Sequence, residues 1–219
     1  MKISLSKISL TVGIMLATTF TFSACSSDEG TNDANRIVYQ GQAYKTVKIG
    51  NQTWMAENLN YEVPGSKCYN DDPTNCNKYG RLYNWAIAIS ICPEGWHLPN
   101  NNEWNELMAA VGGTLTENIY MIPEAGRYLK SKNGWDNYEG IVNEDAYGFA
   151  ALPGGSDGCS LRNGNFGFCG IGSNGQWLSA SEDDDNYVAY YQMGYNVDYV
   201  FLDYGDKILS LFSVRCLQN

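Results

Sequence analysis

Residues 92–104 have the sequence Cys-Pro-Glu-Gly-Trp-His-Leu-Pro-Asn-Asn-Asn-Glu-Trp, and this stretch decides the fold. It joins two predicted helices, the first of which covers the apolar residues Ala86–Ile89. Pro93 lacks the backbone N–H that a continuing helix needs, so the first helix ends before it. Asn100 and Glu103 have the spacing of a capping box, in which each side chain accepts a hydrogen bond from a backbone N–H. A second helix is therefore predicted to begin after Asn100.

The second helix is predicted to bury one stripe of apolar side chains. The spacing i, i+3, i+4, i+7 of one helical face holds Trp104, Leu107, Met108 and Val111. Two glycines at 112–113 end this helix. A third, short helix is predicted over Pro123–Lys130, with proline at its start and a cation at its end. The first helix is apolar on most sides, so we expect it to be largely buried.

Composition predicts one core and an acidic surface. The 219 residues include 14 Lys and Arg against 24 Asp and Glu, which gives a formal net charge of −10. Such a surface repels phosphate backbones, so the chain is not expected to bind nucleic acid. Neutral glycans, cations and basic proteins remain compatible partners. The 16 Tyr and 6 Trp favour β-rich, half-exposed surfaces.

The N-terminal residues have the pattern of a lipoprotein leader. Lys2 and Lys7 form a basic start, and the apolar run that follows is too short to span a bilayer. Residues 1–24 are predicted to be a signal peptide, because small residues before Cys25 resemble a bacterial lipobox in which that cysteine is lipidated. An ordinary secretory cleavage near Ala24 is the alternative.

Two further segments follow the leader. Residues 25–35 are polar and are predicted to be a flexible tether, and residues 36–219 are predicted to be the folded domain. The sequence Ser-Ser-Asp-Glu at 26–29 resembles the export signal of surface lipoproteins in some Gram-negative groups. The expected location is therefore the outer membrane, with the domain exposed at the cell surface and held only by its lipid.

Most of the domain is predicted to be β-structure. Runs of β-forming residues predict strands at 37–39, 44–49, 52–55, 149–152, 176–181, 187–193, 199–202 and 208–217. The second and third of these form a hairpin around Gly50-Asn51. Within 187–193, alternation places Tyr187, Ala189, Tyr191 and Met193 on one face.

Six cysteines of the domain form an even set, which predicts three disulfides in an exported chain. Cys68 and Cys76 bracket a polar segment predicted to be a loop, so a local bridge is the simplest pairing. Cys159 and Cys169 bracket a Gly- and Asn-rich loop or hairpin in the same way. Cys92 and Cys216 then remain, and this pattern is one of 15 connectivities. Free buried thiols are the alternative.

Several segments together resemble the Fibrobacter succinogenes major paralogous domain family. The similarity covers about residues 37–217 and rests on the segments 46–60, 79–85, 92–99, Glu103-Trp104, 148–155, 177–181 and 213–216. Proteins of this family are largely secreted or lipid-anchored and have no assigned function. The resemblance therefore supports the predicted export and gives no activity.

The family pattern is in turn similar to the C-type-lectin-like fold, including its formylglycine-generating enzyme branch. The resemblance implies an α+β domain of two main helices and a short third, packed on irregular antiparallel sheets and held by disulfides. A disulfide from a helix to the last strand is typical of C-type lectins, which favours the Cys92–Cys216 pair. Fold similarity by itself implies no function.

The sequence predicts no catalytic residue. His97 is the only histidine, and between Trp96 and Leu98 we interpret it as a hydrogen-bonded structural residue rather than a base. The formylglycine-generating branch uses a pair of active-site cysteines, which would here be engaged in disulfides. Paired carboxylates of a glycosidase need not be close in sequence, and no local motif indicates them.

Two candidate binding sites lie in the C-terminal half. Glu182, Asp183, Asp184 and Asp185 offer hard oxygen ligands for calcium, although a solvated acidic turn is the simpler interpretation. The sugar-binding signatures of calcium-dependent lectins are missing. The rings of Trp177, Tyr187 and Tyr191 are candidates for stacking on sugars.

These observations predict a binding or adhesion domain for an extracellular polymer, either a polysaccharide or a surface protein. The alternatives are an oxidase of the formylglycine-generating type and a structural subunit of the envelope or of an appendage.

Overall fold

The computed structural model describes residues 35–114 and 121–219. These belong to one compact unit, residues 33–219. The predicted signal peptide, the lipidated Cys25 and nearly all of the predicted tether lie outside the described residues. Within the described ranges, no helix is long and apolar enough to cross a membrane.

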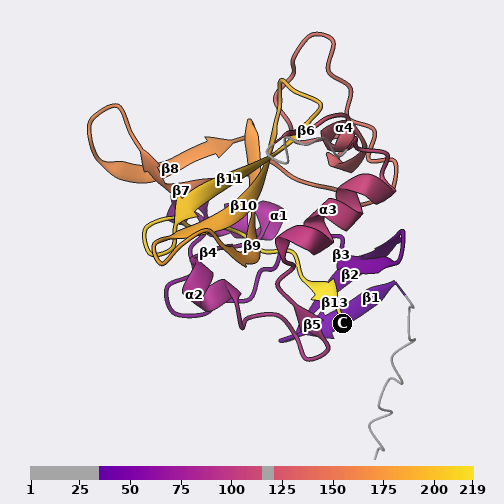
Figure 1. The fold of residues 1–219 in the computed structure, drawn as a ribbon. Helices are drawn as coiled ribbons and strands as arrows, with labels where there is room; N and C mark the ends of the chain where they lie inside the picture. The colour runs from indigo at the N-terminus through magenta and orange to yellow at the C-terminus, as the bar shows by residue number, and fades with distance from the viewer. Residues whose placement is uncertain (1–34, 115–120) are drawn as a thin grey trace, which may run out of the picture. The chain divides into compact units, whose positions relative to one another are not determined.

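A five-stranded antiparallel sheet joins the two ends of the domain (Figure 1). Its strands are β1 (Arg36–Tyr39), β2 (Gln42–Ile49), β3 (Gln52–Met55), β5 (Trp96–His97) and β13 (Leu217–Gln218). The order across the sheet is β1-β2-β3-β13-β5. The predicted hairpin is confirmed, because β2 pairs with β3 from Thr46↔Met55 to Ile49↔Gln52. The last strand therefore lies between β3 and the strand inside the 92–104 stretch.

A second, larger sheet is built mainly from the C-terminal half of the chain. Its strands are β4 (Leu82–Tyr83), β6 (Met121–Ile122), β7 (Gly154–Ser160), β8 (Phe166–Ile171), β9 (Asn174–Glu182), β10 (Tyr187–Gly194), β11 (Val200–Asp206) and β12 (Phe212–Ser213). The order is β4-β12-β9-β10-β11-β6, with β7 pairing with both β8 and β9. The hairpin of β7 and β8 projects from the body of the domain (Figure 1).

The helices are short, and two of the three predicted helices are confirmed, one of them the short helix predicted over 123–130, which is present over Ala125–Leu129. The observed helices are η1 (Tyr69–Asp71), α1 (Pro73–Tyr79), α2 (Trp85–Ala88), α3 (Asn101–Ala110) and α4 (Ala125–Leu129). The structure confirms an α+β fold with few helices, but not two main helices. The predicted first helix is the single turn α2, and Ile89 beside it is 44% exposed, so the expectation of burial on most sides is wrong.

The segment between Cys68 and Cys76 was predicted to be a loop, and it contains the start of helix α1 instead. Asp72 caps this helix by accepting a hydrogen bond from the N–H of Thr74 at 2.9 Å. Pro73 occupies the first helical position, where its missing N–H costs nothing. The cap and proline signals were present, but the surrounding Asn and Asp residues are also typical of loops.

Two strand predictions also need correction. Of residues 149–152, Ala151 makes only an isolated bridge, and the next strand, β7, begins at Gly154. Ile208 and Leu209 were predicted to lie in a strand, but both are exposed in a turn before β12. The prediction failed there because neither residue lies opposite a neighbouring strand.

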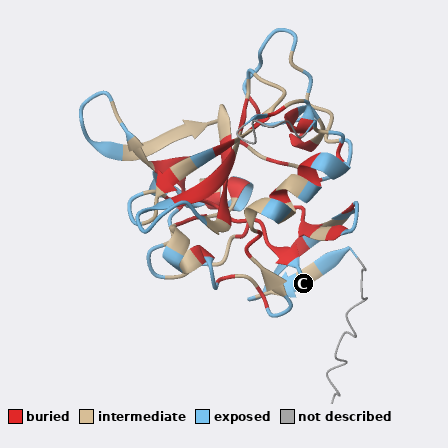
Figure 2. Cartoon of the chain, in the orientation of Figure 1, coloured by how far each residue is buried: buried red, intermediate tan, exposed pale blue. Residues whose placement is uncertain are grey.

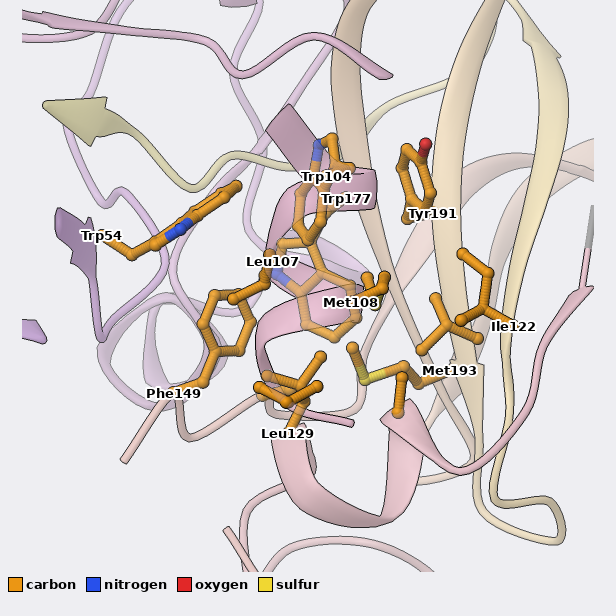
Figure 3. Packing of buried hydrophobic residues seen from close by; sticks show 14 of the residues in the cluster. Trp54, Trp104, Leu107, Met108, Ile122, Leu129, Phe149, Trp177, Tyr191 and Met193 are labelled. Carbon is orange, nitrogen blue, oxygen red and sulfur yellow. The ribbon is translucent and has the colours of Figure 1, made fainter. Parts of the chain in front are cut away.

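Helix α3 confirms the prediction made from the 92–104 stretch. The Asn100 side chain accepts hydrogen bonds from the backbone at the start of the helix, and the Glu103 carboxylate accepts one from the N–H of Asn100 at 2.8 Å. The ring of Trp104 lies between Trp54 and Tyr191, at 4.9 Å from each (Figure 3). All four residues of the predicted apolar stripe are buried. In Figure 2 the buried residues gather in the centre of the domain, whereas the exposed ones lie mainly in the outer loops. This helix therefore joins the two sheets in one core.

Strand β10 is buried on both faces. Ala189, Tyr191 and Met193 pack in the core beneath α3. Val188 and Tyr190 point to the opposite face and pack in a second core, which includes Phe212. The second core therefore covers the face of β10 that carries Val188 and Tyr190, a face to which the sequence pattern assigned no environment.

All three predicted disulfides are present. They are Cys68–Cys76, Cys92–Cys216 and Cys159–Cys169. The second closes a sequence separation of 124 residues and ties the 92–104 stretch to the last strand region. The third lies across the β7–β8 hairpin, which confirms the loop-or-hairpin prediction for that segment.

A buried polar network holds the centre of the domain. Asn58 donates hydrogen bonds to the Tyr79 carbonyl (2.7 Å) and the Ser213 hydroxyl (3.2 Å). Its carbonyl oxygen accepts from Arg215 (2.7 Å) and Trp177 (2.9 Å). Every hydrogen-bonding position of the Asn58 amide is thus filled inside the protein. These residues lie in segments that carry the family resemblance, so those segments serve the fold.

Candidate functional site

A pocket of about 220 Å³ lies on the second sheet, where five strands meet. It is lined by Ser156, Asp157, Gly158, Cys159, Gln176, Tyr190, Tyr204, Gly205, Asp206, Ser210 and Phe212. Pockets for drug-sized ligands measure roughly 300–1,000 Å³, so this one suits a single small polar unit. A larger hollow of about 410 Å³ lies beside β1 and β2, but its charged side chains are exposed, whereas most side chains here are buried.

Strand register brings the polar side chains of the pocket together. Gln176 on β9 lies opposite Gln192 on β10, and Tyr190 lies two residues further along the same face of β10. Tyr190 also lies opposite Asp203 on β11. Because side chains alternate along a strand, these groups share the face that points away from α3.

Tyr190 is held in place by stacking and by hydrogen bonding. Its ring stacks on Phe212 with centroids 4.4 Å apart, and its hydroxyl donates to Asp203 Oδ2 at 3.0 Å. Burial, and then the nearby charge of Asp203, raise the pKa of Tyr190, so the hydroxyl stays protonated. Gly205 makes room for this stack, because a Cβ there would lie 2.9 Å from the Phe212 ring.

Gln176 offers the pocket an acceptor without a partner. The residue is 7% exposed, and its Nε2 donates to Gln192 Oε1 at 2.7 Å. Its Oε1 is buried and has no hydrogen-bond partner among the described residues. A buried acceptor left unpaired costs about 1–3 kcal/mol. A ligand hydroxyl or N–H that reached this oxygen would recover that cost.

The carboxylates around the pocket are already engaged. Asp157 is 7% exposed and accepts from Lys67 Nζ at 2.6 Å. Asp206 Oδ1 accepts from the N–H groups of Ile208 and Leu209, each at 2.8 Å. Their negative charge disfavours an anionic ligand and suits a neutral or cationic one. The site can therefore bind and orient hydroxyl or amino groups.

Two of the three aromatic residues predicted to bind ligand are buried, and the prediction for them is wrong. Trp177 and Tyr191 are both 0% exposed and belong to the core beneath α3 (Figure 3). They are unavailable because α3 covers their face of the sheet. Tyr187 is 45% exposed at the start of β10, and its role in binding stays a prediction.

The acidic segment 182–185 is hydrogen-bonded as a turn. Asp184 Oδ1 accepts from the N–H groups of Asn186 (2.7 Å) and Tyr187 (2.9 Å), and the Asn186 bond is the main cause that lowers the pKa of Asp184. Lys207 forms an ion pair with Glu182. Asp183 and Asp185 remain exposed. In the described ranges, no three His, Cys, Asp or Glu side chains are grouped as metal ligands.

His97 is hydrogen-bonded through both ring nitrogens, as predicted for a structural residue. Its Nε2 lies 2.8 Å from Glu103 Oε1, and its Nδ1 lies 2.6 Å from Asn219 Oδ1. Glu103 also caps α3. His97 therefore links the start of that helix to the C-terminal residue.

The residues that line the pocket were largely missed by the sequence analysis. The alternation of residues 187–193 was a usable signal, because it separates Tyr190 from Tyr191. Gln176 lies beside Trp177 on a predicted strand, and the same rule places it on the other face. No sequence pattern predicts that Asp157 lines the pocket, because its position there depends on the pairing of strands that are distant in the sequence.

Comparison with known proteins identifies one family. The family model described as the Fibrobacter succinogenes major domain matches residues 47–218. Neither curated proteins nor solved structures give a match.

Proposed function

Because this chain belongs to the Fibrobacter succinogenes major domain family, we propose that it is a lipid-anchored protein whose folded domain binds an extracellular polymer. The single observation behind the binding role is the unpartnered oxygen of Gln176 in a pocket beside the Tyr190 hydroxyl. The favoured ligand is a sugar unit of a neutral glycan. A sugar offers hydroxyl donors for that oxygen and brings no negative charge near Asp157.

The proposed fold is C-type-lectin-like. Three features support it: the two chain ends of the domain share one sheet, α3 packs between the sheets, and Cys92–Cys216 links the start of the 92–104 stretch to the last strand region. We do not propose the oxidase activity of the formylglycine-generating branch for this domain. That chemistry needs a pair of thiols, and the six cysteines within the described ranges are in disulfides.

The proposed location is the outer membrane, with the lipid on Cys25 and the domain at the cell surface. Three disulfides agree with an oxidising compartment outside the cytoplasm. Mass spectrometry of the purified protein tests the anchor, because acylation of Cys25 adds the mass of the lipid chains and Cys25→Ser removes it. Surface proteolysis of whole cells tests the exposure.

The binding role is tested with the oxidised mature protein and immobilised cellulose, xylan, pectin, mucin and peptidoglycan. Binding is measured first with calcium and then with EDTA. Binding that survives EDTA supports a calcium-independent site, whereas loss of binding restores residues 182–185 as a metal site. Absence of binding to all five polymers contradicts the glycan proposal and favours a protein partner.

Gln176→Leu is the variant that tests the pocket. It removes the unpartnered oxygen, so we expect affinity for the bound polymer to fall about tenfold, the equivalent of one hydrogen bond of about 1.4 kcal/mol. Stability should change little, because the variant loses the bond to Gln192 and also an unsatisfied buried acceptor. Gln218→Leu, at an exposed position on β13, is the matched control. Equal affinity of both variants would place the ligand elsewhere.

A further inference from the structure

Strand β8 is the outer strand of the β7–β8 hairpin, and one of its edges is open. Within the described residues it pairs with β7 and with no other strand. The hairpin projects at the upper left of Figure 1. Every residue of β8 is at least partly exposed, and Phe166 is 63% exposed. The backbone groups on the outer edge can therefore accept a further strand.

The other edge strands of the domain are short or charged, and β8 is neither. Native proteins protect sheet edges by keeping the outer strands very short or by placing charged residues in them. In the described ranges β4, β5 and β6 have two residues each, and β1 carries Arg36. Strand β8 has six residues, Phe-Gly-Phe-Cys-Gly-Ile, with no charge and no proline. It is therefore the edge at which strand addition is least opposed.

The hairpin holds this edge in a fixed shape. The extra residue of the irregular pairing lies on β7, so the partners along β8 keep their regular spacing. Gly170 has a φ of 83°, and its carbonyl accepts a hydrogen bond from the N–H of Ser173 at 3.0 Å, so the regular edge is 166–169. The Cys159–Cys169 disulfide ties β8 to β7. An edge that is already ordered loses little conformational entropy when it pairs.

The charges at the two ends of β8 are opposite. Arg162 is exposed at the tip of the hairpin. Asp136 is exposed at the other end, where its backbone N–H donates to the Gly172 carbonyl at 2.8 Å. Neither side chain forms an ion pair within the described residues. Antiparallel pairing of two copies places the tip of each beside the base of the other, so each Arg162 comes close to the Asp136 of the other copy.

The other charges recorded around β8 lie over its face. Lys67 lies 5.6 Å from the centre of the Phe168 ring and pairs with Asp157 at 2.6 Å. Asp71 belongs to η1, whose Tyr69 ring packs on Phe168 with centroids 5.2 Å apart. The chain has a net charge of −10, so much of its surface repels a second copy. The uncharged edge of β8 is a place where two copies can approach.

We propose that two copies of this chain pair in antiparallel orientation through the open edges of β8, so that their larger sheets join into one. Main-chain hydrogen bonds supply the affinity, as they do when a peptide adds a strand to a sheet edge. Pairing about a two-fold axis uses the same strand of each copy and closes at a dimer. A second copy also supplies both members of the charge complement, which favours it over an unrelated peptide.

The proposed dimer has a consequence for the ligand pocket. A two-fold axis perpendicular to the joined sheet keeps the same face of both copies on one side. The pocket is lined by residues of β7, β9, β10 and β11, so both pockets would open on that side. One polymer chain could then occupy two pockets and bind more tightly than a single unit. This consequence rests on the function proposed above, whereas the strand pairing does not.

The test is sedimentation of the mature chain, residues 25–219, with its disulfides oxidised. Cys25→Ser keeps lipid and detergent out of the measurement. Over concentrations up to about 200 µM we expect a reversible dimer with a Kd on the order of 100 µM or below, in keeping with a small, transient interface. A monomer at every concentration overturns the proposal. Species larger than a dimer also overturn it, because two-fold pairing closes.

Lysine substitutions in two edge strands provide the matched variants. Phe166→Lys places a charge in the edge of β8, and we expect it to raise the Kd at least tenfold. Val38→Lys is the control, because Val38 is 73% exposed on β1, the edge strand of the other sheet. Both side chains are exposed, so the near-UV circular dichroism should stay unchanged. An equal Kd for the two variants would place the interface elsewhere.

A charge exchange tests the antiparallel orientation. Arg162→Asp and Asp136→Arg should each raise the Kd about fivefold at low salt, because each removes two exposed ion pairs from the dimer. The double variant should return to within about twofold of the original Kd. Two weakened single variants without this recovery overturn the antiparallel arrangement. No polymer is present in these experiments, so failure of the glycan proposal would leave their result unchanged.

Discussion

Asn58 is the residue whose removal tests the architecture most directly, and Asn60, two residues away, is its control. Asn58 fills four hydrogen bonds inside the core, with Tyr79, Ser213, Trp177 and Arg215. The side-chain oxygen of Asn60 is buried and has no hydrogen-bond partner among the described residues. Both positions lie in the same short segment of the family pattern.

The expected cost of Asn58→Ala follows from these contacts. Each neutral hydrogen bond contributes about 1 kcal/mol, and one to a charged group about 1.5–3 kcal/mol, so the four sum to about 5 kcal/mol. Arg215 is 0% exposed, and its guanidinium still contacts the carbonyls of Phe149 and Ala150. In the variant, Arg215 therefore stays buried with one hydrogen-bond partner fewer. The expected loss in the free energy of unfolding is thus at the upper end of the range for single substitutions.

The assay is equilibrium unfolding in urea with the disulfides kept oxidised. A loss of about 5 kcal/mol corresponds to roughly 10–20 °C in Tm for a domain of this size. Asn60→Ala should lower the free energy of unfolding by less than about 1 kcal/mol, because it removes an acceptor that is already unsatisfied. The reasoning is refuted if the two variants differ by less than about 1 kcal/mol.

Two further predictions concern pH and disulfides. Burial lowers the pKa of Lys130 to about 8, with Asp198 opposing the shift, so between pH 8 and 10.5 the unfolded chain binds more protons and stability rises with pH. Urea unfolding should show a gain of about 2 kcal/mol from pH 7.5 to 9.5 that Lys130→Met abolishes, and a flat wild-type profile would contradict the shift. Replacing both cysteines of Cys92–Cys216, with a separation of 124 residues, should cost about 5 kcal/mol, against about 2.5 kcal/mol for Cys68–Cys76, with a separation of 8. Equal losses in thermal unfolding would show that loop length does not set the difference.

The helix signals show where local sequence sufficed. The capping box of Asn100 and Glu103, and the apolar stripe after it, specify α3 through contacts within one turn or one face. The segment 73–79 had comparable cap signals, and α1 was still missed because polar residues suggested a loop. Local patterns therefore identify a helix when an apolar stripe accompanies the cap.

The aromatic residues show where local sequence failed. The alternation of side chains correctly placed Tyr190 and Tyr191 on opposite faces of the strand, but it does not show which face is covered by the rest of the protein. The burial of Trp177 and Tyr191 depends on α3 packing over β9 and β10. The acidic segment 182–185 is hydrogen-bonded as a turn through contacts with Asn186, Tyr187 and Lys207, and no pattern within the segment predicts the contact with Lys207.

The sequence by itself determined the α+β class, the capped helix α3, the β2–β3 hairpin, the three disulfide pairs and the family. Each of these depends on neighbouring residues, on cysteine positions or on segments that match a family pattern. Only the tertiary structure decided which side chains meet in the pocket. Gln176 and Asp157 come together through the pairing of separate strands, and such contacts over long sequence distances have no local pattern.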